Sequence, residues 1–482
     1  MPRSTTFASN KGPSPTAERP PPERAPLDPD VFGVRPAYEL RLGGRAHASG
    51  DPRELRRLPG APREVDPAAL HGYLCFSHPP SPATLFAGVR RVEPPAPWRE
   101  SAPADVDEAA AARRLMELLR ASTRRMLGAE REVGVFLSGG LDSSLVAALL
   151  AEAGARVHLF TLDFGPPWDE EVEHAARVAA HLGRPLHRVP VGPREVSAAL
   201  EPTARALHQP FGDPVTVPLF LLGAAARGRV GTVFNGEGGD QLFGGWATKP
   251  MIAAEAYGGA GYSREAAYLA TYHRFHGAED RLLTPGARAL LGTTDAGAWI
   301  RPALEAEGFP SLLHRLRAAN LRLKGAQNIA PRMAQLAAAH GLAVRAPLLD
   351  RALAEWTFTL PPSLFLRGAE EKHLLKVAAA PLLPADVVWR PKRGMGVPAT
   401  EWCRGSLWGL LGPVRGEVAR RLSARRLRRD GWFRPAYVAD LRAGRDSPGE
   451  PRRRRAGEKL WTLLMLHVWM DVQDPPLELP RP

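Results

Sequence analysis

The stretch Val133–Ser144, with the sequence VGVFLSGGLDSS, decides the predicted fold. Its first five residues are mostly apolar and predict a buried β-strand. A turn follows at residues 138–140, and Asp142 and Ser143 open a helix, LVAALLAEA, that stops at Gly154. Glycines let a backbone approach a ligand closely, and the free N–H groups and dipole of a helix N-terminus favour an anion. The stretch therefore predicts a phosphate-binding loop between a strand and a helix.

The type of phosphate loop follows from the residues that are present and from one that is missing. No Gly-Lys-Ser/Thr follows the glycines, so the loop is not a Walker A loop. It resembles the pyrophosphate loop, Ser-Gly-Gly-x-Asp-Ser, of enzymes that split ATP between its α and β phosphates. A Gly-Gly pair is usually only a turn, but the whole pattern directly after a buried strand favours the phosphate-binding interpretation.

Strands and helices alternate after this loop. Strands are predicted at 158–164, 185–191 and 230–234, with helices between them, one of which runs from Glu170 to Leu182. This order predicts an α/β fold, a doubly wound parallel sheet with helices on both faces, followed by a mostly helical part over about 250–470. Ligands of such sheets bind at the carboxyl ends of the strands, so we expect the loops that follow the strands to converge there.

Composition limits the class of protein. The net charge of +13, carried mostly by arginine, would suit a nucleic-acid partner, but the arginines are dispersed and accompany no aromatic stripe, so we expect no nucleic-acid partner. The two cysteines, Cys75 and Cys403, exclude a disulfide scaffold and a CxxC site and predict a cytoplasmic protein. No run of 18 apolar residues and no signal-peptide segment occurs, so we expect no membrane partner.

A second glycine-rich loop, NGEGGDQLFGGW, spans residues 235–246. Its glycines allow the backbone to press on a ligand, and Glu237 and Asp240 project from the same loop. One carboxylate can hold Mg²⁺ and the other can act as a base. Alternatively, the loop is a glycine-rich hairpin whose two acidic residues are simply exposed to solvent. Its predicted position at the same edge of the sheet as the phosphate loop argues against this.

Three further segments carry functional side chains. They are VRAPLLD at 344–350, EKHLLK at 371–376 and WRPKRGMGVP at 389–398. The last combines the cations Lys392 and Arg393 with two glycines, so it can close over ATP and neutralise charge on departing pyrophosphate. Each segment alone is weak evidence, since a Lys-Arg-Gly sequence is usually a surface turn.

Together and in this order, the motifs resemble the synthetase domain of the glutamine-hydrolysing asparagine synthetase family, over about residues 66–471. The resemblance implies a sheet of the adenine nucleotide α-hydrolase, or pyrophosphate-loop, type. We therefore predict a disordered arm at 1–30, a remnant of an N-terminal glutaminase domain at 31–65 and an ATP-dependent ligase domain at 66–475. Relatives of this family include β-lactam synthetases and lasso-peptide cyclases, which adenylate other substrates.

The resemblance also implies roles for individual residues. Catalytic roles fall to Glu237, Lys392 and Arg393, and the substrate side would be shaped by Asp350, Glu371 and Lys372. Nucleotide contacts fall to Leu137, Ser138, Gly139, Gly140, Asp142, Ser143, Leu162, Asn235 and Gly236. Mg²⁺ would be held by Asp142 and Asp240, with Asp169 as a helper.

The implied reaction has two steps. A substrate carboxylate, with aspartate expected, attacks the α-phosphate of ATP to give acyl-AMP and pyrophosphate, and an amine or ammonia then displaces AMP. Ammonia would come from solution or from a separate glutaminase subunit, because residue 2 is Pro where the family carries its nucleophilic cysteine. A homodimer is a further option.

The sequence departs from the family pattern at three places: Asn235 replaces a serine, Gln241 replaces a glutamate, and 334–339 lacks the usual Ser-Met-Ala. These departures leave open a biosynthetic ligase that uses an amine on its own substrate. An RNA-modifying enzyme would need a tRNA-binding module, which the sequence does not show. A non-catalytic scaffold conflicts with the retained Asp142 and Glu237.

Overall fold

The structure is a computed structural model of the whole chain. It describes residues 30–94, 98–101, 106–245, 248–257, 259, 262–391, 394–404, 412–445 and 450–482. The arm predicted at 1–30 therefore lies, apart from residue 30, outside the described residues. Lys392 and Arg393 also lie outside them.

A five-stranded parallel sheet forms the centre of the nucleotide-binding part, with the strand order β6-β5-β4-β7-β8. Its strands are β4 (Glu132–Phe136), β5 (Arg156–Asp163), β6 (Leu186–Pro190), β7 (Thr232–Phe234) and β8 (Ala343–Arg345). The chain moves outward from β4 to β6 and then crosses back to β7, so the carboxyl ends of β4 and β7 lie next to each other. This crossover is the place where a doubly wound sheet binds its ligand.

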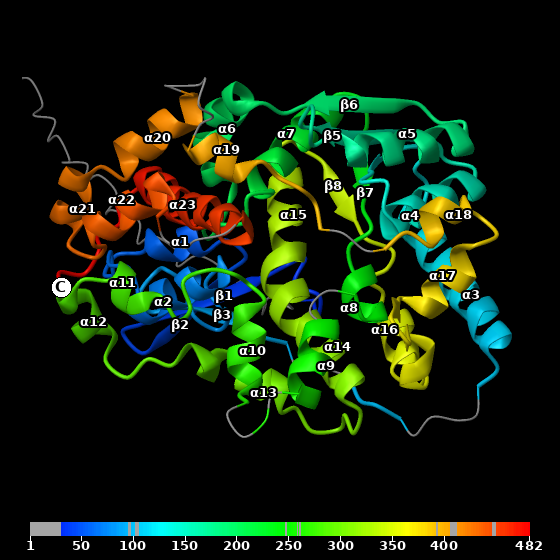
Figure 1. Cartoon of the computed structure of the whole chain (residues 1–482), viewed down its shortest axis with the longest axis horizontal. Coiled ribbons are helices and arrows are strands. Elements are labelled where there is room, and N and C mark those ends of the chain that lie inside the picture. The colour runs from blue at the N-terminus through cyan, green and yellow to red at the C-terminus, as the bar shows by residue number, and fades with distance from the viewer. Residues whose placement is uncertain are drawn as a thin grey trace, which may run out of the picture.

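Helices cover both faces of the sheet, as predicted (Figure 1). The helices between and beside the strands are α3 (Glu108–Leu127), α4 (Leu141–Glu152), α5 (Glu170–Leu182), α6 (Pro193–Ala206), α7 (Thr216–Ala226) and α8 (Gly239–Phe243). The strand side chains alternate between two cores. Val133 and Val135 pack in the core with α3, α4 and α5, whereas Phe136 packs in the core with α6 and α7. Since both faces of the sheet are buried, the strand sequences are nearly continuous runs of apolar residues.

Local sequence signals account for the element boundaries. The helix predicted from Glu170 to Leu182 has these same bounds and ends at Gly183, whose φ of +60° is the left-handed conformation favoured by glycine. The helix α2 (Pro67–Phe76) begins after Asp66, whose side chain accepts a hydrogen bond from the N–H of Ala69 at 2.9 Å.

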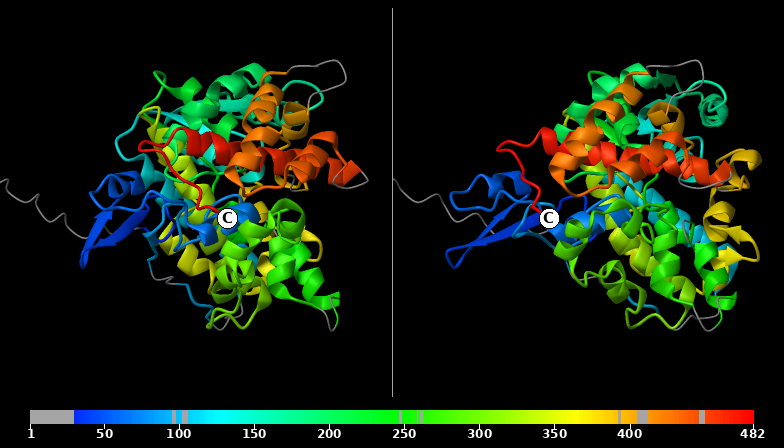
Figure 2. Two further views of the ribbon diagram at one scale, coloured as in Figure 1. Left: turned by 90° about the vertical axis from the view of Figure 1, so that its left-hand side faces the viewer. Right: turned by 60° about the vertical axis from the view of Figure 1, so that its left-hand side comes forward.

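A separate three-stranded antiparallel sheet contains β1 (Ala37–Leu42), β2 (Arg45–Ser49) and β3 (Val89–Val92), with the short helix α1 (Pro52–Arg56) beside it. The strands β1 and β2 pair as a hairpin around the turn at residues 43–44. Because β3 lies beyond residue 65 and pairs with β1, this sheet crosses the predicted domain boundary, which stays a prediction. Figure 2 shows its hairpin projecting from one side of the molecule.

The first sheet is joined to the end of the chain. The N–H of Val65 donates to the carbonyl of Glu478 at 2.9 Å, and the N–H of Glu478 donates to the carbonyl of Arg63 at 3.1 Å. Arg56 donates through Nη2 to the carbonyl of Pro476 at 3.0 Å. Both views of Figure 2 show the last segment of the chain running beside this first part.

The rest of the chain is mostly helical, as predicted. Its helices are α9 (Thr248–Tyr257), α10 (Arg264–Ala270), α11 (Glu279–Leu282), α12 (Pro285–Leu291), η2 (Ala296–Trp299), α13 (Arg301–Leu304), α14 (Leu312–Asn320), η3 (Leu321–Ile329), α15 (Ala330–Ala338), α16 (Arg351–Thr357), η4 (Pro362–Leu364), α17 (His373–Ala379), α18 (Ala385–Val388), α19 (Ala399–Arg404), α20 (Pro413–Arg421), α21 (Ala424–Asp430), α22 (Pro435–Ala443) and α23 (Glu450–Asp471), with a two-stranded ribbon of β9 (Leu366–Arg367) and β10 (Glu370–Glu371). The strand β8 in this part was not predicted. In the described residues, no helix has both the length and the apolar character needed to cross a membrane.

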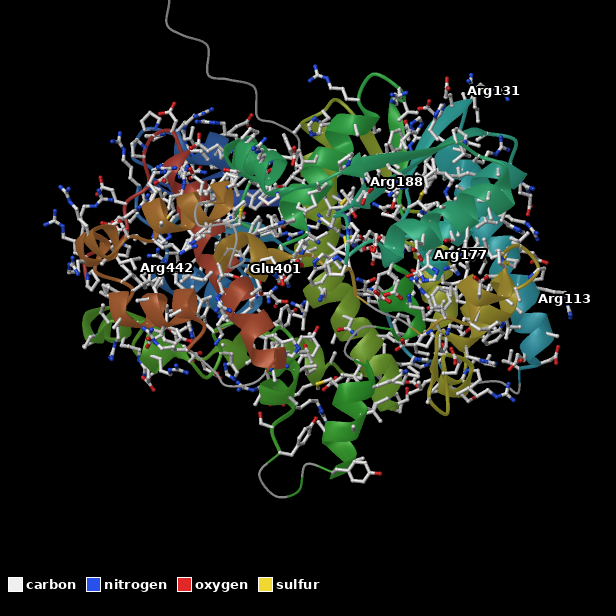
Figure 3. The ribbon with its side chains drawn as sticks, turned by 45° about the horizontal axis from the view of Figure 1, so that its top comes forward. Arg113, Arg131, Arg177, Arg188, Glu401 and Arg442 are labelled. Atoms are coloured by element: carbon white, nitrogen blue, oxygen red, sulfur yellow. The ribbon has the colours of Figure 1, made fainter. Side chains whose placement is uncertain are left out.

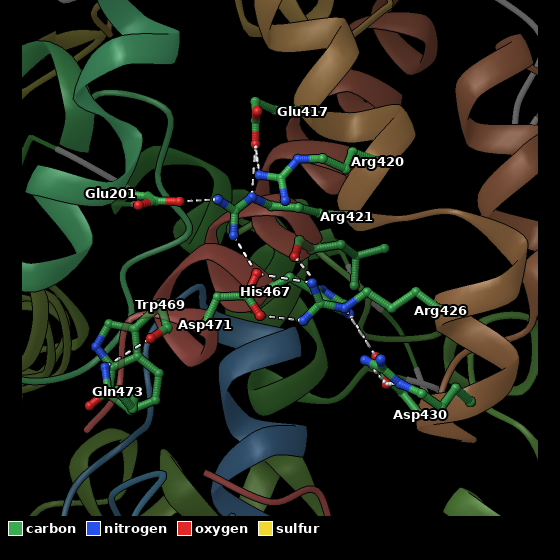
Figure 4. A network of polar contacts seen from close by, with 12 residues as sticks. Glu201, Glu417, Arg420, Arg421, Arg426, Asp430, His467, Trp469, Asp471 and Gln473 are labelled. Atoms are coloured by element: carbon green, nitrogen blue, oxygen red, sulfur yellow. Dashed lines mark hydrogen bonds and ion pairs between the residues drawn. The ribbon is translucent and has the colours of Figure 1, made fainter. Parts of the chain in front are cut away.

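Buried ion pairs hold the C-terminal helices to the sheet part (Figure 4). The side chain of Arg421, at the end of α20, is 2% exposed and pairs with Glu201 of α6 at 2.6 Å and with Glu417 at 2.8 Å. It also pairs with Asp471 at the end of α23, which Arg426 of α21 contacts at 2.5 Å. One buried guanidinium thus joins three helices, because its five N–H donors reach several carboxylates at once.

The basic surface is dispersed, as the sequence indicates. Figure 3 labels Arg113, Arg131, Arg177, Arg188 and Arg442, which are exposed and lie on different elements. Two of them are paired locally, Arg177 with Asp386 at 2.9 Å and Arg188 with Asp163 at 2.8 Å. Part of the positive charge is therefore balanced by acidic neighbours.

Candidate active site

The predicted phosphate loop connects β4 to α4. Gly139 has a φ of +69°, and a Cβ built there would lie 2.5 Å from the backbone nitrogen of Ala175 in α5, so only glycine fits this position. The hydroxyl of Ser143 accepts a hydrogen bond from the N–H of Ser138 at 3.3 Å and donates to the carbonyl of Gly140 at 3.3 Å. The loop is thus folded over the first turn of α4, where unpaired N–H groups are available to an anion.

The second glycine-rich loop lies directly against the first. A Cβ on Gly236 would come within 2.5 Å of the backbone nitrogen of Ser143, and a Cβ on Gly239 would come within 2.3 Å of Cγ of Asp142. The predicted convergence of the two loops at adjacent strand ends is therefore confirmed. Their contact requires two glycines, since any larger residue would push the loops apart.

One buried lysine joins the two acidic residues of these loops. Nζ of Lys372 lies 2.6 Å from Oδ2 of Asp142 and 2.6 Å from Oδ1 of Asp240, and its side chain is 4% exposed. Lys372 adopts the left-handed conformation, with a φ of +58°, which costs energy for a residue with a side chain. The surrounding structure maintains this conformation, and the ammonium balances two nearly buried carboxylates.

The two carboxylates also have the chemistry to hold a divalent cation. Oδ1 of Asp142 is buried and has no hydrogen-bond partner among the described residues. A buried carboxylate oxygen without a partner is unfavourable, and a cation would satisfy it. Carboxylate oxygens are the ligands that Mg²⁺ prefers, so Asp142 and Asp240 fit the predicted role.

A cavity of about 290 Å³ opens beside the two loops. Its apolar part contains Phe136, Leu137, Thr161, Leu162, Val215, Leu219, Leu222, Met333 and Met395. Its polar part contains Ser138, Asp142, Ser143, Glu171, Asn235, Gly236, Glu237, Asp240, Gln241, Lys324 and Arg332. The apolar part, next to the phosphate loop, suits the base of a nucleotide, and the polar part suits a charged substrate.

Two cations, Lys324 and Arg332, line the cavity. Burial lowers the pKa of Lys324 to about 7, and Arg332 adds to the effect while the charge of Asp213 opposes it. Arg332 is 4% exposed and pairs with Asp213 at 3.2 Å. Burial alone would raise the pKa of Asp213, but the cations Arg332, Arg274 and Lys324 outweigh it and lower the pKa to about 2. This group carries net positive charge and suits an anionic substrate.

A π-helical segment presents these cations to the cavity. Residues 312–338 form one continuous helical run, in which η3 adopts the wider π conformation between α14 and α15. Lys324 lies within η3, and Arg332 follows it in the first turn of α15. The wider turn changes the direction of side chains relative to an α-helix, and such segments are frequent at functional sites.

Comparison with known proteins agrees with this geometry. The family model described as asparagine synthase matches residues 114–471. The chain belongs to the asparagine synthase family. It is therefore an enzyme of the ligase class, and the family assigns it ATP-dependent amide formation.

Individual relatives are distant in sequence. A Mycobacterium tuberculosis (H37Rv) protein, provisionally named asparagine synthetase (glutamine-hydrolysing), is 28% identical over 494 residues, which cover 91% of this chain and 73% of that protein. Asparagine synthetase (glutamine-hydrolysing) 1 of Bacillus subtilis is 22% identical, with 92% and 74% covered. Among solved structures, the NMN synthetase from Francisella tularensis has a TM-score of 0.22 and 19% identity, covering 29% of this chain and 59% of that one.

Other residues predicted for this asparagine synthase site lie in different surroundings. Asp169 precedes α5 and is not among the cavity residues, whereas Glu171 is. Asp350 begins α16, where its side chain accepts a hydrogen bond from the N–H of Leu353 at 2.9 Å, and it also pairs with Arg125. Their predicted roles stay predictions.

The basic loop approaches the cavity on both sides of its two undescribed residues. Gly394 and Met395 belong to the cavity, and Nη2 of Arg390 lies 3.9 Å from the position of a Cβ on Gly140. The predicted roles of Lys392 and Arg393 fall outside the described residues. Arg390 is a further cation near the phosphate loop that the sequence did not single out.

Sequence reasoning missed three polar residues of the cavity: Glu171, Lys324 and Arg332. Lys324 and Arg332 come from a helical run whose sequence has no sign of a π segment, so their direction could not be predicted. The run carries several other cations, among them Arg315, Arg317 and Arg322, so nothing in the sequence marked these two. Glu171 lies in the first turn of α5, where an acidic residue also has a structural explanation.

Proposed function

We propose that this asparagine synthase family member converts aspartate into asparagine in two steps. ATP first activates the side-chain carboxylate of aspartate as acyl-AMP, with release of pyrophosphate, and ammonia then displaces AMP. The single observation that carries the proposal is the contact between the two glycine loops, which brings Asp142, Glu237 and Asp240 to one cavity.

The chain's own residues would bind and orient ATP. Adenine would lie in the apolar part of the cavity, between Leu137 and Leu162. The phosphates would meet the N–H groups of residues 138–143. Mg²⁺, held by Asp142 and Asp240, would neutralise phosphate charge when bound. Lys372 would remain beside the departing pyrophosphate as a fixed positive charge, and Lys392 and Arg393 would close the site from the basic loop.

The α-carboxylate of aspartate would bind Lys324 and Arg332. Nε of Arg332 is buried and has no hydrogen-bond partner among the residues that the structure describes. A bound carboxylate would satisfy this donor, and guanidinium groups recognise carboxylates with high geometric specificity. Glu237, which also lines the cavity, would accept a proton from the attacking ammonia.

The test is ATP-dependent pyrophosphate release by the purified chain with aspartate and ammonium, compared with the same mixture without aspartate. Release that requires aspartate, together with asparagine in the products, would support the proposal. ATP turnover that ignores aspartate would overturn it and favour a ligase that uses an amine on its own substrate. Addition of glutamine in place of ammonium tests whether a separate glutaminase subunit is needed.

Glu237→Gln should uncouple the two steps. We expect acyl-AMP formation, measured by hydroxylamine trapping, to stay within a few-fold of wild type, because glutamine keeps the size of the side chain. Asparagine formation should fall by about 100-fold or more, since a lost general base typically costs this much. The exposed Glu173→Gln in α5 serves as the control and should behave as wild type. Normal asparagine formation by Glu237→Gln would remove this residue from the mechanism.

The pH dependence of kcat/KM for aspartate should reveal Lys324. With a pKa of about 7, its ammonium is present below pH 7 and is lost as the pH rises through that value. If the ammonium binds the substrate carboxylate, kcat/KM should fall above pH 7. Lys324→Arg should move the decline to higher pH, because guanidinium stays protonated. A profile that is the same in wild type and Lys324→Arg would contradict this assignment.

A further inference from the structure

Four potential metal ligands lie between α2 and α11 and are not among the residues that line the nucleotide cavity. His71 and Cys75 are one turn apart on α2, while His276 and Glu279 lie just before and at the start of α11. The side chains of His71 and Cys75 are buried, with 6% and 0% exposure. Figure 1 shows α2 and α11 on the left of the molecule, whereas β7 and α8 lie right of its centre. The proposed reaction therefore gives these residues no role.

The ligand atoms of His71, Cys75 and Glu279 are spaced as in a tetrahedral site. Nε2 of His71 lies 3.4 Å from Oε1 of Glu279 and 3.6 Å from Sγ of Cys75, and Sγ lies 3.7 Å from the same Oε1. Tetrahedral zinc, with its usual bond lengths, requires separations of about 3.3–3.5 Å for N···O, about 3.5–3.6 Å for S···N and about 3.5–3.7 Å for S···O. These three distances between ligand atoms are thus close to the separations expected for tetrahedral zinc.

A fourth ligand is available on the more open side. Nδ1 of His276 lies 3.6 Å from Oε1 of Glu279 but is not within ligand distance of both His71 and Cys75. Its side chain is 33% exposed, so it can turn toward an ion to complete the site and leaves a path for that ion. One thiolate, one carboxylate and two neutral imidazoles would balance the two charges of a divalent cation. Buried sites favour such neutrality, because an uncompensated charge in a protein interior is costly.

We propose that His71, Cys75, His276 and Glu279 form a structural zinc site. The mixed sulfur, nitrogen and oxygen set and the tetrahedral spacing favour zinc over magnesium or calcium, which take only oxygen ligands. Binding converts the thiol of Cys75 to a thiolate and releases its proton. With four protein ligands the site is closed, which is the arrangement of structural rather than catalytic zinc.

The metal would fasten two parts of the chain that are distant in sequence. Residues 71 and 75 belong to the helix next to the first sheet, and residues 276 and 279 begin the helical part. Zinc on Nε2 of His71 leaves the ring proton on Nδ1, a buried atom with no hydrogen-bond partner among the described residues. Loss of the hydrogen-bond acceptor for the second ring nitrogen of a metal-binding histidine lowers metal affinity by roughly 10- to 100-fold. We therefore expect zinc to bind here more weakly than at sites where each ligand histidine has such an acceptor.

Cobalt(II) is the first probe, because a thiolate ligand gives a charge-transfer band in the near ultraviolet and tetrahedral geometry gives intense visible bands. The full chain, freed of metal with a chelator, should show both after one equivalent of cobalt, and zinc should displace it. Cys75→Ser should lose the charge-transfer band. Cys403→Ser is the matched control, since it removes the chain's other buried cysteine, and it should keep the spectrum.

Stoichiometry and stability complete the test, and neither depends on ligase activity. Wild type should retain one zinc per chain after gel filtration, and zinc should raise its melting temperature. His276→Gln changes the most exposed ligand and should fold normally, yet it should weaken zinc binding by more than about 10-fold. Wild-type chain that retains no zinc, or Cys75→Ser and His276→Gln variants that bind zinc as wild type does, would overturn the proposal.

Discussion

Replacing Asp142 with asparagine should nearly abolish ATP-dependent pyrophosphate release. The carboxylate of Asp142 contacts Lys372 at 2.6 Å and lies against Gly239 of the second loop. Asparagine has the same size but no charge, so it would weaken the proposed Mg²⁺ ligand and leave the buried ammonium with Asp240 alone. Loss of one preorganised electrostatic contact at a reacting centre typically costs about 100- to 1,000-fold in rate, and we expect a reduction at least this large.

The control for this variant is Asp163→Asn. Asp163 also lies at the carboxyl end of a parallel strand and pairs with a cation, Arg188, but it is not part of the cavity. We expect it to keep most of its pyrophosphate release. Measurement uses a coupled pyrophosphate assay on both variants, with melting temperatures to exclude unfolding. Wild-type rates in Asp142→Asn would show that the ATP site has been assigned to the wrong residues.

Gly236→Ala should also have a large effect on the reaction. A single methyl group there would come within 2.5 Å of the backbone nitrogen of Ser143, a distance that a Cβ does not tolerate. Because backbone atoms cannot move aside as a flexible side chain can, the loop carrying Glu237 and Asp240 would shift away from the phosphate loop. Misplacement of about 1 Å in a catalytic arrangement can cost about 100-fold, so we expect a loss of this order in asparagine formation.

A second glycine of the same strand provides the matched control. Gly231 lies just before β7, as Gly236 lies just after it, and a Cβ on Gly231 would meet no atom within 4 Å. Gly231→Ala should therefore keep its activity and stability. Equal activity of the two variants would show that the contact between the loops is not required for the reaction.

Much of this architecture followed from local signals in the sequence. The strand ending at residue 136, the glycine turn and the helix that begins at Leu141 were predictable because apolar periodicity and turn glycines act within a few positions of one another. Convergence of the two loops was also predictable, since parallel strands place their carboxyl ends at one edge. These rules do not depend on distant parts of the chain.

The features that escaped prediction depend on long-range packing. Strand β8 has three residues, too few for a pattern, and it is a strand only because β7 pairs with it. Lys372 meets Asp142 and Asp240 because three separate segments pack together. The π segment that presents Lys324 to the cavity has no known sequence signal. In each case tertiary contacts, rather than local preference, determine the outcome.

The hydrogen bonds between residues 63–65 and Glu478 have a consequence for folding during synthesis. The ribosome makes the first sheet early, yet its backbone partner at residue 478 is made only after the parallel sheet and the helical part. Closing the long loop between residues 65 and 478 carries an entropic cost, which the contacts between its ends must offset. Domains also generally fold in the order of their synthesis. The parallel sheet around β4 can therefore assemble while the chain is still growing, but the join between residues 63–65 and Glu478 can form only once residue 478 has left the ribosome.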